Sequence, residues 1–329
     1  WEVAAGEFRI AQRMEPGDAA PLFGLGRIAA LRKDPRQALS HYEEALRLDP
    51  RRVDLLEEIV SLRLQEGEIQ VAIDRCLSQL KSSPRNPYIY GLLGRICLSQ
   101  GRERDAEGYL RKALEIDPNL PSAHLHLGRL YEKRHSDDLA IEHYRRAINS
   151  AQSSKLKAQN WLTIDVNPAV LPVYVWLGSL YETQGKWEEA RKVYEEAVAI
   201  DPQFAPALNN LAWLYAEQGE NLDQALSLAQ RAKEVLPEDP FISDTLGWIF
   251  YRKGLYPTAI RSLREAVEKA LQNPTIHYHL GVAYRKHGEA DPAKGELREA
   301  LRLNLEAAHA GEARRLLKEM GEGLQLKGK

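Results

Sequence analysis

The chain has no long hydrophobic run, no excess of charge of either sign and only two cysteines. Its 329 residues carry 45 basic and 47 acidic side chains, which gives a net charge of -2. A balanced charge creates no global field toward nucleic acid or an anionic membrane. The longest mostly apolar stretch, 169–177, is short and interrupted by proline, so it is not expected to span a bilayer. Neither nucleic-acid partners nor direct membrane insertion are predicted.

Catalytic and metal-binding motifs are also scarce. Residues 24–29 imitate half of a dinucleotide-binding fingerprint, but no strand precedes them. His124 and His126 are two residues apart on an expected helix, as are His277 and His279, so the side chains of each pair diverge and cannot jointly hold a metal. No arrangement of nucleophile, histidine and carboxylate can be nominated. The sequence therefore predicts no enzyme, no cofactor and no metal site.

What the chain has instead is an internal repeat of about 34 residues. The copy that begins at Leu171 has glycine at position 8, tyrosine at 11, glycine at 15, alanine at 20, tyrosine at 24, alanine at 27 and proline at 32. Val60 departs from this pattern at position 8 of its copy, and Ala225 stands one residue late for position 20. Eight copies fall into register, beginning at Ala19, Val53, Pro87, Pro121, Leu171, Ala205, Pro240 and Pro274.

This pattern resembles that of the tetratricopeptide repeat superfamily, over roughly residues 1–307. Small residues at positions 8 and 20 let two antiparallel helices approach closely, and proline at position 32 ends the second helix. The resemblance implies an all-α fold, a right-handed α-solenoid of helix–turn–helix units in which first helices line the inner surface. Eight full repeats are expected, with an N-terminal half repeat and a C-terminal capping helix.

The expected organisation has five segments. Residues 1–18 are interpreted as the second helix of a truncated repeat, 19–154 as units 1–4, 155–170 as an insertion, 171–307 as units 5–8, and 308–329 as a capping helix and tail. Because the chain begins within a repeat, without an initiator methionine or a signal peptide, a missing upstream portion is expected. The cellular compartment cannot be deduced from such a chain.

Two features leave alternatives open. The insertion is either a longer outer helix with a loop, or a segment whose Trp161 contacts a partner or covers part of the inner groove. Cys76 and Cys97 occupy core positions of neighbouring units. They are either small buried hydrophobic residues or a disulfide, which would require an oxidising compartment.

The inner surface is predicted from helix geometry. Positions 2, 5, 9 and 12 of each first helix form one stripe. Position 9 is arginine in three early units and tryptophan in two later ones, and aromatic and polar residues surround the tryptophans. Exposed tryptophan and tyrosine on a concave face are typical of peptide anchors. The predicted peptide-binding residues are Arg27, Arg95, Arg129, Asn209, Trp213, Phe241, Asp244, Trp248, Tyr251 and Tyr278.

Two interpretations of the same stripe need no ligand. Glu57 and Glu132 could neutralise the arginines within the solenoid. Trp213 and Trp248 could pack against each other along the inner wall. The sequence leaves both open.

Comparison within the superfamily removes two specialised functions. Members that clamp a terminal carboxylate have lysine at position 5, and this chain has none there. Members fused to protein O-glycosyltransferases have an asparagine ladder at position 6, where only Asn210 stands here. Segments 208–215 and 244–248 loosely resemble closing repeats of large bacterial proteins of envelope and exopolysaccharide export. That resemblance implies a bacterial periplasm or envelope, with the cytoplasm left open.

The predicted function is a protein-interaction scaffold that binds an extended peptide or a helix of another protein in its groove. The alternative is a structural spacer or self-assembly module of a larger envelope or transferase protein, which works through its outer face and the insertion. Self-association remains open.

Overall fold

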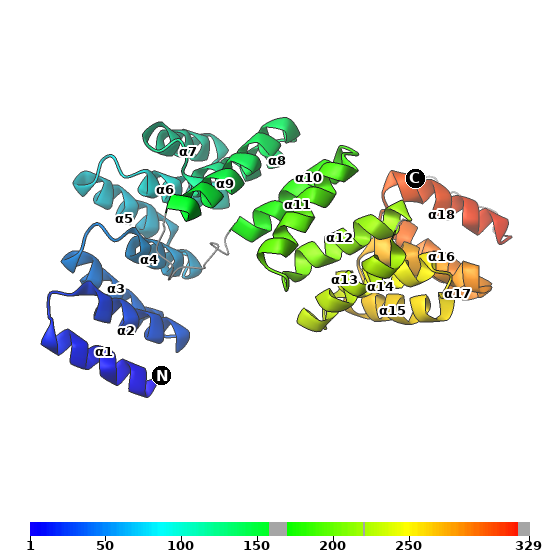
Figure 1. The fold of residues 1–329 in the computed structure, drawn as a ribbon, viewed down its shortest axis with the longest axis horizontal. Helices are drawn as coiled ribbons and strands as arrows, with labels where there is room; N and C mark the ends of the chain where they lie inside the picture. The colour runs from blue at the N-terminus through cyan, green and yellow to red at the C-terminus, as the bar shows by residue number, and fades with distance from the viewer. Residues whose placement is uncertain (158–169, 220, 322–329) are drawn as a thin grey trace. The chain divides into compact units, whose positions relative to one another are not determined.

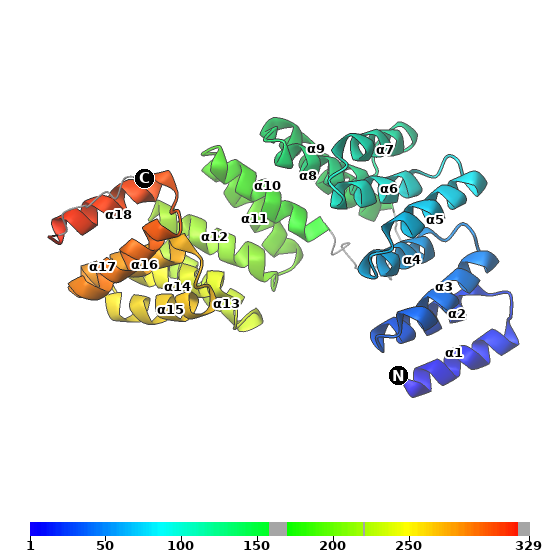
Figure 2. The same cartoon turned by 180° about the vertical axis from the view of Figure 1, so that it is seen from behind.

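The computed structural model describes residues 1–157, 170–219 and 221–321, and every regular element within these ranges is a helix (Figures 1 and 2). The all-helical prediction is confirmed. The chain forms two compact units, Trp1–Val166 and Asn167–Lys329, which are described separately.

The first unit contains the helices up to the insertion. They are α1 (Glu2–Met14), α2 (Ala19–Leu31), α3 (Pro35–Leu48), α4 (Val53–Gln65), α5 (Ile69–Ser82), α6 (Pro87–Ser99), α7 (Glu103–Ile116), α8 (Pro121–Lys133) and α9 (Asp137–Lys157). The second unit contains α10 (Leu171–Thr183), α11 (Trp187–Ile200), α12 (Ala205–Gln218), α13 (Leu222–Val235), α14 (Pro240–Arg252), α15 (Tyr256–Lys269), α16 (Pro274–His287), α17 (Ala290–Arg302) and α18 (Ala307–Glu319). The even-numbered helices α2 to α16 begin at the residues from which the repeats were counted.

Local chemistry fixes these helix starts. Asp18, Asn86, Asp239 and Asn273 each precede a first helix and accept a hydrogen bond from a backbone N–H of its first turn. Such caps satisfy amide groups that have no partner within the helix. Proline within the first turn of α6, α8, α14 and α16 loses no hydrogen bond there.

The turn between the two helices of a repeat has one recurrent conformation. Position 15 has a positive φ in all eight repeats, and glycine occupies it in six of them. Lys33 and His135 occupy it in the other two, with φ of 59° and 54°. Glycine adopts this left-handed region without steric cost, whereas residues with a Cβ do not.

Close packing within each helix pair explains glycine at position 8. A Cβ added at Gly178 would lie 2.2 Å from the ring of Tyr194, at position 24 of the same repeat. Equivalent glycines lie against Tyr42, Leu110, Tyr144, Leu263 and Leu297. A large residue at position 24 therefore requires glycine at position 8.

The two repeats without glycine at position 8 have small residues at the facing position. Val60 belongs to the same core cluster as Cys76, which stands at position 24, and both are fully buried. Ala212 is matched in the same way by Ala229, the equivalent position once the late register of that repeat is counted. The volumes of the two positions compensate, as close packing requires.

The cysteines are packing residues. Cys76 and Cys97 are both free and buried, and burial raises the pKa of the Cys76 thiol to about 12. A thiol in such surroundings is unreactive.

The terminal helices cover the ends of the stacked pairs. The ring of Phe8 on α1 packs against Gly24 of α2. At the other end α18 lies beside α16 and α17 (Figures 1 and 2), and its Ala313 and Leu317 join Tyr278 and Leu297 in one core cluster. Of the predicted insertion, α9 includes the first residues up to Lys157 and α10 begins at Leu171. Trp161 lies outside the described residues.

Candidate functional site

Four aromatic residues of the predicted stripe lie together in the second unit, and we call them the aromatic row: Trp213 on α12, Trp248 and Tyr251 on α14, and Tyr278 on α16. The rings of Trp213 and Trp248 stack with centroids 6.2 Å apart. Tyr251 stacks on Trp248 at 4.8 Å. Both tryptophans are partly buried and partly open to solvent. The stacking that the sequence left as an alternative is therefore present, and it leaves part of each indole exposed.

His279 holds the two indoles together, although the sequence did not single it out as a site residue. Its ring centroid lies 4.5 Å from that of Trp248 and 5.4 Å from that of Trp213. Its Nδ1 lies 2.8 Å from Oδ1 of Asp244, and both side chains are buried. His279 is at position 6 of its repeat, outside the stripe of positions 2, 5, 9 and 12. Position 6 of this repeat lies near position 9 of the preceding repeat, where Trp248 stands. That relation between repeats could have identified His279 from the sequence.

Hydrogen bonds to carboxylates fix the orientation of the row. Nε1 of Trp248 donates to Oε1 of Glu217 at 2.6 Å, and the hydroxyl of Tyr278 donates to Oε2 of Glu312 at 2.8 Å. Burial, together with this hydrogen bond, raises the pKa of the Tyr278 hydroxyl. A tryptophan held in this way has little rotamer freedom to lose on binding.

The remaining residues predicted around the row differ in accessibility. Asp244 and Tyr278 are 7% and 3% exposed, and both lie against the ring of His279, which in turn contacts the indoles. Phe241 is 56% exposed and open to a partner. Asn209 lies one helical turn before Trp213 and is partly buried.

Two acceptor groups, on Asn209 and Glu182, border the row. The side-chain oxygen of Asn209 is buried and, among the described residues, has no hydrogen-bond donor. Glu182 on α10 accepts a hydrogen bond from the hydroxyl of Tyr194. Burial and the nearby charge of Glu217 raise the pKa of Glu182. This edge of the row is therefore rich in acceptors and in negative charge.

The predicted arginines lie in the first unit. Arg27 and Arg129 are exposed, and Arg95 is partly buried. Arg95 forms an ion pair with Glu57 at 3.7 Å, which is the neutralisation that the sequence left open. Glu132 instead accepts a hydrogen bond from the buried hydroxyl of Tyr144.

A histidine accompanies these arginines. His126 is partly buried, and burial, with the neighbouring charges of Arg95 and Arg129, lowers its pKa to about 4. It is uncharged at neutral pH, so the positive charge on this face comes from the arginines.

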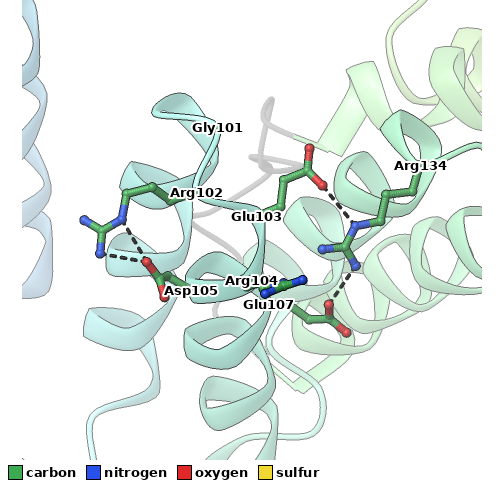
Figure 3. Close-up of a pocket in the computed structure, with 7 residues that line it drawn as sticks. All are labelled: Gly101, Arg102, Glu103, Arg104, Asp105, Glu107 and Arg134. Atoms are coloured by element: carbon green, nitrogen blue, oxygen red, sulfur yellow. Dashed lines mark hydrogen bonds and ion pairs between the residues drawn. The ribbon is translucent and has the colours of Figure 1, made fainter.

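A surface hollow in the first unit has a different character (Figure 3). Its charged side chains pair with one another: Arg134 bonds Glu103 at 3.1 Å and Glu107 at 2.7 Å, and Arg102 bonds Asp105 at 2.8 Å. These five side chains satisfy each other, and none of them is an activated nucleophile. The hollow is a structural ion-pair network.

Two features are absent from the described part of the chain. Within residues 1–157, 170–219 and 221–321, no three histidine, cysteine or acidic side chains gather as metal ligands would. None of the helices formed by these residues combines the length and the apolar character needed to cross a bilayer.

Family models match four stretches of the chain. A model described as TPR repeat matches residues 174–219 and 247–288. Two models described as tetratricopeptide repeat match residues 19–52 and 87–120. These matches fall in both units and include most of α10, α12 and α16.

Curated relatives are similar to parts of the chain. A TPR repeat-containing protein of Pseudomonas aeruginosa is 28% identical over 148 residues, which is 44% of this chain and 25% of the relative. Hsp70-Hsp90 organizing protein 1 of Glycine max is 25% identical over 251 residues, 76% of this chain and 41% of the relative. The chain thus spans less than half the length of either relative.

Solved structures share the fold. The crystal structure of the APC/C hetero-tetramer Cut9-Hcn1 aligns with a TM-score of 0.62 at 18% identity, covering 92% of this chain and 56% of that chain. PilF of Pseudomonas aeruginosa aligns with a TM-score of 0.53 at 22% identity, covering 70% of this chain and 97% of that chain. At these identities the likeness concerns the fold alone.

Proposed function

Because the chain belongs to the tetratricopeptide repeat superfamily, whose repeats generally mediate protein–protein interactions, we propose that it is a non-catalytic scaffold that holds a segment of another protein. The segment, an extended peptide or a helix, lies along the first helices. It is anchored at Trp213 and Trp248 in the second unit. Arg27, Arg95 and Arg129 form a separate basic surface on the first unit, which attracts acidic groups of a partner.

The aromatic row carries this proposal. Its two indoles are partly exposed on neighbouring first helices, and His279 and Glu217 hold them in place. Aromatic side chains that are fixed before binding contribute large contact area at little entropic cost, and such residues dominate protein interfaces. Phe241 on α14 extends the apolar surface.

The proposal is tested by cross-linking capture from a lysate of the source cell. The intact chain is compared with a Trp213→Ala/Trp248→Ala variant, and circular dichroism confirms that both are folded. We expect a protein to be captured by the intact chain and at least tenfold less by the variant, as the loss of about 1.4 kcal/mol or more of hot-spot contact implies.

Trp187 provides a matched control. It is 44% exposed on α11, a second helix, so Trp187→Ala removes an exposed indole away from the row. Capture should survive this change. Equal capture by the intact chain and the double variant would refute groove binding through the row, and would favour contacts through the second helices or self-assembly.

A further inference from the structure

We infer that the segment held by the second unit presents an arginine side chain to the aromatic row. This inference rests on the proposed function and adds the chemistry of the bound residue. It follows from three groups that border the row: the carboxylates of Glu182 and Glu217, and the side-chain oxygen of Asn209.

Within the described residues, the two carboxylates accept hydrogen bonds from neutral groups only. Each accepts one neutral hydrogen bond, Glu182 from the hydroxyl of Tyr194 and Glu217 from the indole of Trp248. In the described part of the chain, no arginine or lysine forms an ion pair with either carboxylate. Burial, and then electrostatic repulsion from the charge of Glu217, raise the pKa of Glu182. A cation placed between them would relieve this repulsion.

Neighbouring cations are already engaged elsewhere. Arg252 donates to the backbone carbonyl of Glu217 at 3.1 Å, not to its carboxylate. Lys253 pairs with Asp223, and Arg285 pairs with Glu319 at 2.6 Å. The negative charge beside the row is therefore available to a cation from outside the chain.

Asn209 gives an independent indication of a donor. Its side-chain oxygen is buried without a donor among the described residues. Asn209 and Trp213 are four residues apart on α12, so they share one face of the helix. A buried acceptor without a donor is costly, and rotation of the Asn209 amide toward a ligand that donates a hydrogen bond removes that cost.

Arginine matches these features better than other residues do. Its planar guanidinium stacks on indole and phenol faces, and its five N–H groups can reach a carboxylate and an amide oxygen together. Stacking of a cation on tryptophan adds an electrostatic attraction to the ring face. Lysine offers the charge without the plane, and an acidic residue would be repelled by Glu182 and Glu217.

The test uses a fluorescein-labelled peptide with arginine at its centre and leucine on both sides, measured by fluorescence anisotropy. Three further peptides replace the arginine with citrulline, lysine or glutamate. Citrulline keeps the shape of arginine and removes the charge. We expect the arginine peptide to bind roughly tenfold more tightly than the citrulline peptide, and lysine to fall between them. The glutamate peptide should bind most weakly.

A Glu182→Gln/Glu217→Gln variant removes both charges and keeps the oxygens that accept from Tyr194 and Trp248. It should bind the arginine peptide more weakly than the intact chain does, and should keep only the smaller preference for arginine over citrulline that stacking on the indoles provides. Glu234→Gln/Glu268→Gln makes the same change of net charge on α13 and α15, where both residues are exposed, and should keep the preference for arginine.

The outcomes separate this inference from the proposed function. Binding that needs Trp213 and Trp248 but does not prefer arginine to citrulline would overturn the inference and leave the scaffold role intact. Failure of the arginine peptide to bind at millimolar concentration would also overturn it. Binding that prefers arginine but survives loss of both tryptophans would contradict anchoring at the row.

Discussion

At the scale of single residues, the turn at position 15 shows where this chain departs from its own pattern. Six repeats place glycine there, and Lys33 and His135 adopt the same left-handed conformation. A residue with a Cβ costs about 1 kcal/mol in that region relative to glycine.

We therefore expect Lys33→Gly to stabilise the first unit. The gain is about 1 kcal/mol from relieved backbone strain, minus the cost of the extra conformational entropy that glycine gives the unfolded chain. Gly185→Ala, at the same position in the second unit, should destabilise by a similar amount. Chemical denaturation measures both. Stabilisation by Gly185→Ala would contradict the assignment of strain to this position.

A second residue-scale prediction concerns pH. His143 lies against His124, with their Nδ1 atoms 2.9 Å apart. Burial and the charge of that histidine lower the pKa of His143 to about 4, from an ordinary value of about 6.5. Between these values the unfolded chain binds more protons than the folded one. The contribution of His143 to the free energy of unfolding is therefore fully present above about pH 6.5. It falls as the pH drops toward 4, by up to about 1.4 kcal/mol per pH unit.

Thermal unfolding at a series of pH values tests this prediction. His143→Asn should flatten the slope between pH 6.5 and 4. His135→Asn is the matched control, because His135 is exposed and asparagine tolerates its positive φ. An unchanged slope in His143→Asn would show that other groups set the acid sensitivity.

At the scale of helices, proline and the aspartate or asparagine caps made the element boundaries predictable. These residues act on the backbone next to them, so their effect can be deduced without knowledge of tertiary contacts. The compensation between positions 8 and 24 was less accessible. Val60 alone looks like a lapse in the repeat, and its reason appears only when it is paired with Cys76 in the same core cluster.

This compensation predicts a strong coupling between the two positions. Val60→Gly should leave a cavity and Cys76→Leu should overpack, each costing roughly 1–4 kcal/mol. The double variant copies the glycine–leucine pair of Gly94 and Leu110. It should be more stable than the sum of the single changes predicts, by about 0.5–3 kcal/mol. Additive free energies of unfolding would refute the compensation.

The candidate site was predictable in part for a related reason. Helix periodicity placed Trp213, Trp248 and Tyr251 on one stripe, and the structure brings these residues together. The sequence could not decide between stacked and open indoles, because that choice depends on rotamers and on distances between helices. Glu217 and His279 were missed because they lie at positions 13 and 6, beside the stripe and not on it.

At the scale of the whole molecule, each compact unit encloses its own core. One core cluster extends from Ala19 to Ile96 in the first unit, and others lie within the second, around Leu263 and Leu317. In repeat proteins, stability comes from each repeat and its immediate neighbours.

Residues 1–157 and 171–329, produced separately, are therefore each expected to fold. Circular dichroism should show helical spectra and cooperative melting for both. An unfolded half would mean that its stability depends on the rest of the chain. If the second half folds, it should also keep the preference for the arginine peptide.

The central claim is that a partner lies on the first helices of the second unit, at the aromatic row. Hydrogen–deuterium exchange of the intact chain, with and without the captured partner, tests it most directly. We predict protection concentrated in α12, α14 and α16. Protection confined to the second helices α11, α13, α15 and α17 would contradict the account and place the interaction on the outer face.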